Sequence, residues 1–389
     1  MTITEFMDRH HAAGECLDAP GCLNRLLADM DRGLRGQGPI PMIPSYLKGG
    51  TRPSPGSACC VLDAGGTNLR TARAVFGPDG VCRLEELEQT VMPGTTRELN
   101  FEEFYSALAR SVERLGSYER VGFCFSYNVT LDRTLDGPLD FWCKEVRVPE
   151  AVGQPVGASL RAALGKSCRS VHVLNDSVAA MLGAGDVQVG VILGTGINAC
   201  YSEPCRRIPK VPADLKAESM IISTEVGEFD GFPRSDFEET VIAASATPDA
   251  APAEKQCSGG YLGDVIAAAW HAAKREGLLE QCPPADLGSV SRLLRDCPGT
   301  PAAKIAAIAI QRAAKIAAVL CAGPMLRAAG KNSSVRVAVE GSQYWRLTGF
   351  REAFHQELDN LLPQLSYEIV HAENACLIGA AIAAWADPM

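Results

Sequence analysis

The amino-acid sequence predicts an α/β protein built from two similar halves, each a mixed β-sheet covered by helices. Two matching stretches, residues 61–76 and 189–201, support this prediction. Each consists of an apolar strand, a glycine-rich turn that bears a threonine, and a second strand. Helical patterns of apolar residues lie between and after these hairpins. A duplicated unit of this kind places a ligand-binding cleft between its halves.

Composition limits the classes of protein to which the chain can belong. It has 389 residues, 47% of them hydrophobic, which is enough for a large core divided into two or three domains. The formal net charge of −9 argues against a general nucleic-acid or membrane binder, since both need a basic face. The 15 cysteines include no C-x-x-C pair, so we expect reduced thiols in a cytoplasmic protein. The acidic N-terminal segment lacks the apolar core of a signal peptide.

The first elements follow from local pattern. Residues 3–35 are expected to be helical with a break near Pro20, because apolar residues after it recur on one helix face. A linker rich in proline, glycine and serine covers residues 36–57. Residues 58–76 then form the first hairpin, and residues 81–91 add a third strand.

The rest of the chain alternates helices and strands. Residues 101–115 have the spacing of an amphipathic helix, a strand begins at Val121, and the segment 171–203 reads as strand, helix and hairpin. The remaining predicted elements are helices at 261–276, 287–295, 302–329, 350–362 and 377–385 and a strand at 335–342. Charged and polar residues interrupt the apolar segment 302–329, so we expect a core helix there rather than a membrane span.

Asn175 and Asp176 lie between a predicted strand and a predicted helix. One interpretation is that they cap the helix, as Asn and Asp commonly do. The other is that a carboxylate at the end of the strand faces the cleft and accepts a proton from a substrate hydroxyl. The residues by themselves leave both interpretations open.

The glycine turns of the two hairpins are suited to phosphate. Backbone N–H groups, together with Thr67 and Asn68, can surround phosphate oxygens. Arg70 can pair with phosphate, and Asp63 can hold water around Mg²⁺. Ordinary hairpin turns are the alternative, and the match between the two turns favours phosphate. Other isolated polar residues read by themselves as solvent-facing side chains: Lys144, Glu225 and Asp264.

From about residue 58 to the C-terminus, the chain carries a series of motifs that resembles the hexokinase family of the actin-like sugar-kinase superfamily. Within that family it resembles a bacterial hexokinase or glucokinase. The motifs are VLDAGGTNLR, GFCFSYNV, FWCKE, VHVLNDSVAAM, GVILGTGINACY, ISTEVGEFDGFPRSDFE, SGGYLGDV and VAVEGSQY. The resemblance implies a two-lobed actin-like ATPase (ribonuclease H-like) fold, with mixed five-stranded sheets flanked by helices and an active site in the interlobe cleft. The implied parts are an N-terminal helix and linker on the large lobe (1–56), the small lobe (57–174), the large lobe (175–372) and a C-terminal helix returning to the small lobe (373–389).

The resemblance also implies roles for the matching residues. Asp176 is the implied catalytic base, and Lys144 is implied to lie near the transferred phosphate. The implied hexose-binding residues are Ser126, Lys144, Asn175, Asp176, Asn198 and Glu225, with Asp264 where the family usually has Glu. The implied ATP-binding residues are Asp63, Gly65, Gly66, Thr67, Asn68 and Arg70 in the first turn, Gly194, Thr195 and Gly196 in the second, and Gly341 and Ser342 on the adenosine side. Asp63 is also the implied metal contact.

Four departures from the family pattern are visible. Asn128 replaces the proline of the FSYP-type box, Cys143 replaces a threonine, and Asp264 is shorter than the usual Glu. Residues 374–379 lack a glycine and a serine that would face ATP. Three of the four changes fall on the sugar side, so they suggest an altered sugar preference or weaker sugar affinity.

The resemblance therefore implies an ATP-dependent kinase that phosphorylates the 6-hydroxyl of glucose or a related hexose, with ATP and Mg²⁺ as cofactors. We expect a cytoplasmic monomer or homodimer without nucleic-acid or membrane partners. The alternative is a catalytically weak or inactive sugar-binding regulator of the same fold. Another actin-like ATPase, such as a chaperone or an acetate-type kinase, is disfavoured by the sugar-side motifs.

Overall fold

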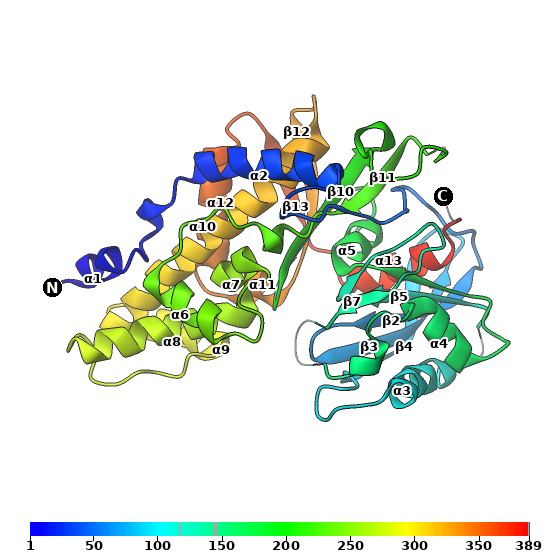
Figure 1. Cartoon of the computed structure of the whole chain (residues 1–389), viewed down its shortest axis with the longest axis horizontal. Coiled ribbons are helices and arrows are strands. Elements are labelled where there is room, and N and C mark those ends of the chain that lie inside the picture. The colour runs from blue at the N-terminus through cyan, green and yellow to red at the C-terminus, as the bar shows by residue number, and fades with distance from the viewer. Residues whose placement is uncertain (117, 143–145, 216, 388) are drawn as a thin grey trace.

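The computed structural model describes residues 1–116, 118–142, 146–215, 217–387 and 389. It has two lobes, each built on a mixed β-sheet flanked by helices, and it confirms the predicted fold class (Figure 1). The strand order is β4-β3-β2-β5-β8 in the smaller sheet and β1-β11-β10-β9-β12-β13 in the larger one. A short two-stranded sheet, β6-β7, completes the topology of the described residues.

The smaller lobe begins with the first predicted hairpin, β2 (Ala58–Ala64) and β3 (Asn68–Phe76), which pair antiparallel. The other strands of this lobe are β4 (Cys82–Val91), β5 (Arg120–Phe125), β6 (Asn128–Val129), β7 (Leu139–Phe141) and β8 (Ser170–Leu174). Its helices are α3 (Phe101–Glu113), η2 (Pro149–Ala151) and α4 (Val156–Leu164). The last helix of the chain, α13 (Ala375–Ala384), packs on β2, β5 and β8 of this sheet.

The larger lobe contains the second predicted hairpin, β9 (Val189–Leu193) and β10 (Ile197–Pro204). Its sheet also holds β1 (Ile43–Pro44), β11 (Ser219–Ser223), β12 (Ser334–Glu340) and β13 (Ser366–Val370). The helices outside the smaller lobe are α1 (Ile3–Arg9), η1 (Gly14–Cys16), α2 (Ala19–Leu34), α5 (Asp176–Gly183), η3 (Cys205–Arg207), η4 (Val226–Glu228), α6 (Asp236–Ala244), α7 (Pro252–Cys257), α8 (Gly259–Arg275), α9 (Leu287–Asp296), α10 (Pro301–Ala329), α11 (Ser342–Arg346) and α12 (Phe350–Leu361).

The N-terminal helices differ from the prediction in where the break falls. The helical stretch ends at Arg9, and the next long helix, α2, begins at Ala19 with Asp18 as its N-cap. Pro20 lies in the first turn of α2, where its missing N–H costs no intrahelical hydrogen bond. Pro20 therefore helps to begin a helix instead of breaking one. The α2 helix packs against α10 near one end of that helix (Figure 1).

The predicted linker contributes a strand to the larger sheet. Within residues 36–57, β1 pairs antiparallel with β11, and the Ser45 N–H donates to the Ile221 carbonyl at 3.1 Å. Ile40, Met42 and Leu47 are buried beside it. The larger sheet consequently has six strands, one more than predicted, because a proline-containing segment can pair at a sheet edge.

The helix α10 is a core helix. It is long and apolar enough to cross a membrane by length and composition, yet 78% of its most apolar 18-residue window is buried inside the fold. It contacts α2, α8, α12 and β10, which surround it in Figure 1. Its burial therefore accounts for its apolar composition.

Two glycines let α5 and α13 approach closely. A side chain at Gly379 would stand 1.9 Å from the Ala179 carbonyl oxygen, and one at Gly183 would stand 1.9 Å from the Ala375 carbonyl oxygen. Both helix backbones are therefore in contact with each other. Because α5 begins at Asp176, this packing fixes the position of Asp176 relative to the smaller sheet.

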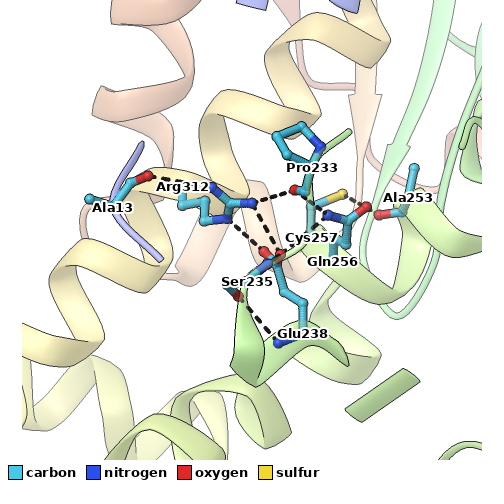
Figure 2. A network of polar contacts seen from close by, with 8 residues as sticks. All are labelled: Ala13, Pro233, Ser235, Glu238, Ala253, Gln256, Cys257 and Arg312. Atoms are coloured by element: carbon cyan, nitrogen blue, oxygen red, sulfur yellow. Dashed lines mark hydrogen bonds and ion pairs between the residues drawn. The ribbon is translucent and has the colours of Figure 1, made fainter. Parts of the chain in front are cut away.

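A buried polar network joins several elements of the larger lobe (Figure 2). Arg312 on α10 donates from Nε to Glu238 Oε1 at 2.8 Å and from Nη2 to the Pro233 carbonyl at 2.6 Å. Glu238 on α6 also accepts from Gln256 Nε2 on α7 at 3.2 Å. Since Arg312 and Glu238 are 2% and 1% exposed, their charges depend on each other for compensation.

Candidate active site

A cleft of about 450 Å³ opens between the two lobes. The smaller lobe contributes Gly66, Thr67 and Ser126 to its lining, and the larger lobe contributes Asn198 and Glu225. Further lining residues are Tyr127, Asn128, Phe141, Trp142, Asn175, Asp176, Thr195, Gly196, Gly227, Glu228, Glu254, Lys255, Gly260 and Tyr261. The cleft thus brings most of the implied sugar side chains together with one residue or more of each glycine turn.

Asn175 and Asp176 occupy the end of β8 and the start of α5. Asn175 is the N-cap, and its Oδ1 accepts from the Ser177 backbone N–H at 2.8 Å. Asp176 is the first helical residue, and its carboxylate stands at the positive end of the helix dipole while lining the cleft. The two interpretations of this pair are therefore compatible, with Asn175 in the capping position and Asp176 at the cleft.

Asn198 and Glu225 form a preassembled polar group on the floor of the cleft. Asn198 Nδ2 donates to Glu225 Oε1 at 2.6 Å, and the Glu225 backbone N–H donates to Asn198 Oδ1 at 3.0 Å. Ser223 Oγ donates to the same Oε1 at 2.7 Å. Glu225 has a left-handed backbone with φ of 58°, which these contacts hold in place. Carboxylate and amide groups held in this way can bind several sugar hydroxyls.

The environment of Glu225 changes its acidity. The pKa of the Glu225 carboxyl is raised from 4.5 to about 7, chiefly by burial and also by the charges of Asp176 and Glu254. The hydrogen bonds from Ser223 and Asn198 lower the same pKa. An acid whose pKa is raised by burial and by neighbouring acids in a cleft is typical of functional sites.

Glu225→Gln is expected to stabilise the unliganded protein at neutral pH and to weaken sugar binding. With its pKa raised, folded Glu225 keeps a proton that the unfolded chain releases, so its contribution to stability falls as pH rises from 4.5 to about 7. We expect the variant to gain about 1–3 kcal/mol in unfolding free energy near pH 8 and almost nothing near pH 4.5. Urea unfolding at both pH values measures this difference.

The exposed Glu280→Gln is the matched control and should change stability at neither pH. A Glu225→Gln protein that is less stable than the wild type near pH 8 would contradict the prediction. Glucose affinity of this variant, measured by calorimetry near pH 8, should fall about 100-fold, because a hydrogen-bond acceptor that is mostly ionised at this pH becomes a neutral amide.

The second glycine turn is held against the start of α8. The Gly194 N–H donates to the Gly196 carbonyl at 3.0 Å and closes the turn. The Gly259 N–H donates to the Gly194 carbonyl at 2.8 Å, and the Gly260 N–H donates to the Thr195 carbonyl at 2.9 Å. These bonds position Thr195 and Gly196 at the cleft.

Gly341 and Ser342 follow β12, beside the second turn. Gly341 has φ of 120°, and a side chain there would lie 2.2 Å from the Leu193 carbonyl oxygen. Glycine is therefore required for the chain to pass so close to Gly194. Ser342 begins the short helix α11. The structure thus brings the implied adenosine-side pair next to the second turn.

Asp63 and Arg70 form an ion pair at the base of the first turn. Arg70 Nε donates to Asp63 Oδ2 at 2.9 Å, and Nη1 donates to Asn374 Oδ1 at 3.4 Å. Arg70 is thus engaged with the Asp63 carboxylate and the start of α13 in this structure. Gly65 and Asn68 close the turn above it, since the Gly65 N–H donates to the Asn68 carbonyl at 3.0 Å.

Among the described residues, no group of three or more His, Cys, Asp or Glu side chains is arranged to hold a metal ion. Mg²⁺ does not need such a cage, because it keeps several waters and is bound by one or two carboxylates together with substrate phosphates. Arg70 donates twice to Oδ2 of Asp63, which is 7% exposed and is not among the residues that line the cleft. Its carboxylate is the type of ligand that suits a hydrated Mg²⁺.

Asp264 does not lie with the other implied sugar residues. It lines a separate hollow of about 820 Å³ together with His10, Asp236 and His271. Gly260 and Tyr261 at the start of α8 line the cleft, and Asp264 lies one helical turn beyond them. That part of α8 faces α6. Lys144 and Cys143 lie outside the described residues.

Sequence reasoning did not select Glu254, which lines the cleft. Glu254 lies on α7, and its Oε2 accepts from the Ile197 backbone N–H at 3.1 Å, directly after the second turn. It was missed because residues 245–258 are rich in alanine and proline and read as a loop. The glycine pair that follows at 259–260 was the available signal, since glycines mark close backbone approach.

The fold places the chain in a structural class, the two-lobed proteins with an actin-like fold. The structure superposes on the hexokinase from Schistosoma mansoni complexed with glucose with a TM-score of 0.83, at 22% identity, covering 99% of this chain and 100% of that one. The ROK hexokinase from Thermus thermophilus gives a TM-score of 0.55 at 19% identity, covering 85% and 98%.

Sequence comparison is more specific. Two family models described as hexokinase match the chain, one over residues 19–185 and the other over 188–291 and 301–386. The chain belongs to the hexokinase family.

Plant hexokinases are among the curated relatives. The chloroplastic hexokinase-4 of Oryza sativa subsp. japonica is 34% identical over 273 residues, which cover 63% of this chain and 53% of that protein. Hexokinase-7 of the same plant is 32% identical over 283 residues, covering 66% and 61%. The chain thus spans a little over half the length of the curated relatives it matches.

Proposed function

We propose that the protein is an ATP-dependent hexose kinase that phosphorylates the 6-hydroxyl of glucose or a related hexose. The observation that supports this most directly is the shared cleft: Asp176, Asn198 and Glu225 line the same cavity as Gly66 and Thr195 of the two glycine turns. A sugar and a nucleoside triphosphate can bind next to each other in this cavity. Family membership and the glucose named for the S. mansoni structure support the same substrate pair.

Asp176 is the proposed general base. Its carboxylate takes the proton from the 6-hydroxyl as the hydroxyl oxygen attacks the γ-phosphorus of ATP. The bond between that phosphorus and the oxygen bridging to the β-phosphate breaks, and ADP leaves with the electron pair of this bond. Asp176 then releases the proton to solvent. The start of α5 holds the carboxylate at the point of reaction.

The other residues bind and orient. Asn175, Asn198 and Glu225 accept from and donate to the sugar hydroxyls, which fixes which hydroxyl reaches Asp176. The backbone N–H groups of Gly66, Thr195 and Gly196, which line the cleft, face the phosphates and stabilise the charge on their oxygens. Mg²⁺, held through water by Asp63, would neutralise part of the phosphate charge.

The alternative of an inactive sugar-binding regulator is not favoured. That alternative was suggested by Cys143, Asn128 and residues 374–379. However, the proposed base Asp176, the Asn198–Glu225 pair and residues of both glycine turns all line the cleft. Asn374, within the segment 374–379, accepts a hydrogen bond from Arg70 beside the first turn. We therefore retain the active enzyme as the proposal.

The test is a coupled assay that measures ADP release from ATP and Mg²⁺ over a panel of hexoses. We expect release that depends on sugar, and a product phosphorylated at the 6-position by mass spectrometry and NMR. Glucose lacking the 6-hydroxyl should bind without turnover. Binding of glucose and ATP with no turnover on any hexose would instead identify a regulator.

A further inference from the structure

A hydrogen bond links the sugar side of the cleft directly to the first glycine turn. The Tyr127 hydroxyl donates to the Gly65 carbonyl at 2.7 Å. Tyr127 is 4% exposed, and its ring packs against Phe125 at 4.8 Å and edge-on against Trp142 at 4.9 Å between centroids. The ring therefore cannot move far, and the hydroxyl meets the turn in a defined place.

The same segment also holds the preceding peptide group of the turn. The Ser126 N–H donates to the Ala64 carbonyl at 3.2 Å, and the Gly65 N–H of that peptide donates to the Asn68 carbonyl at 3.0 Å. The Ala64–Gly65 peptide is thus held at both ends. The next peptide, Gly65–Gly66, is held at its carbonyl by Tyr127.

The geometry of a peptide determines what this bond does. The Gly65 carbonyl and the Gly66 N–H belong to one planar trans peptide, so they point in opposite directions. Glycine on both sides of this peptide removes the side chains that would otherwise resist its rotation. Fixing the carbonyl toward Tyr127 therefore fixes the direction of the Gly66 N–H, at a residue that lines the cleft.

We propose that Tyr127 is a positioning residue, whose hydroxyl holds the Gly65–Gly66 peptide so that the Gly66 N–H faces the phosphates of ATP. The proposal rests on the proposed function, which places phosphate at this turn. Tyr127 follows Ser126, an implied sugar residue that lines the cleft, so one segment borders the sugar side of the cleft and holds the phosphate turn.

Tyr127→Phe tests the proposal, because it retains the ring and removes the hydroxyl. The Gly65–Gly66 peptide can then rotate, and the N–H contact with phosphate is lost in part of the molecules. We expect the KM for ATP to rise about 10-fold, as for the loss of one charge-assisted hydrogen bond. The KM for glucose should stay within about 2-fold, and the melting temperature should change little, because the packing with Phe125 and Trp142 remains.

Tyr105→Phe is the matched control. Tyr105 is a tyrosine of α3 in the same lobe, 2% exposed and packed against Phe101 and Phe104. Its variant should leave the KM values for ATP and glucose unchanged. An unchanged KM for ATP in Tyr127→Phe, or an equal rise in both KM values, would overturn the proposal.

A separate measurement keeps this result distinct from a failure of the proposed function. If the wild type releases no ADP with any hexose, the proposed function fails. Calorimetry with ATP and Mg²⁺ then compares binding to the wild type and to Tyr127→Phe. About 10-fold weaker binding to the variant supports the role of Tyr127, and equal binding overturns it.

Discussion

Asp176→Asn is expected to lower kcat for sugar-dependent ADP release by about 10³-fold. A positioned general base contributes about 10²- to 10⁴-fold, and the amide cannot accept the proton from the 6-hydroxyl. Asparagine has nearly the same shape, so α5 should begin at the same place and the cleft should keep its form. Glucose affinity, measured by calorimetry, should fall far less than kcat, since Asn175, Asn198 and Glu225 remain.

The control for this variant is Asp186→Asn, which changes an exposed aspartate shortly after α5 that pairs only loosely with Arg336, at 3.7 Å. Its kcat should stay within about 2-fold of the wild type. A kcat for Asp176→Asn within 10-fold of the wild type would assign the base to another residue. Equal losses in kcat and in glucose affinity would instead indicate that Asp176 mainly binds sugar.

Both hairpins and the start of α5 were predictable because local sequence determines them. An apolar run followed by adjacent or closely spaced glycines defines strand and turn within about ten residues. Asp176 was likewise visible as an acid placed after a strand and before a helix. The family resemblance added the sugar residues, and the structure places Ser126, Asn198 and Glu225 in one cleft.

What the sequence could not predict depends on contacts distant in the chain. The edge strand β1 exists because β11, nearly 180 residues later, offers it a partner. Glu254 reaches the cleft because α7 packs beside η4. Asp264 does not line the cleft, because it lies one helical turn further along α8. Arg70 was expected to bind phosphate. In the structure it pairs with the Asp63 carboxylate, which lies directly opposite it in the β2–β3 register. Local pattern carries no signal for such pairings.

Arg312→Met is expected to lower the free energy of unfolding by about 3–5 kcal/mol. The substitution leaves Glu238 buried, at 1% exposure, without the guanidinium that compensates its charge. It also removes one of the two donors to the Pro233 carbonyl, the other being Gln256 (Figure 2). Urea unfolding measures the loss, and Arg292→Met, at an exposed arginine of α9, should change stability by less than about 0.5 kcal/mol.

The double variant Arg312→Met/Glu238→Gln separates two explanations of that loss. If the cost comes from the uncompensated Glu238 charge, neutralising Glu238 should restore a large part of it, and the two single costs should add to more than the double cost. If the cost comes from lost packing of the Arg312 side chain, Glu238→Gln should restore nothing. Strict additivity would therefore contradict the role assigned to the ion pair.

The network also reaches the cleft through α7. Gln256 donates to Glu238, and Glu254, two residues earlier on the same short helix, lines the cleft and accepts from the Ile197 N–H. Loss of Arg312 should therefore loosen α7 and weaken glucose binding as well as stability. Since a ligand that binds only the folded state stabilises it, saturating glucose should recover part of the lost unfolding free energy. A variant that is destabilised with unchanged glucose affinity would show that α7 is held by its other contacts.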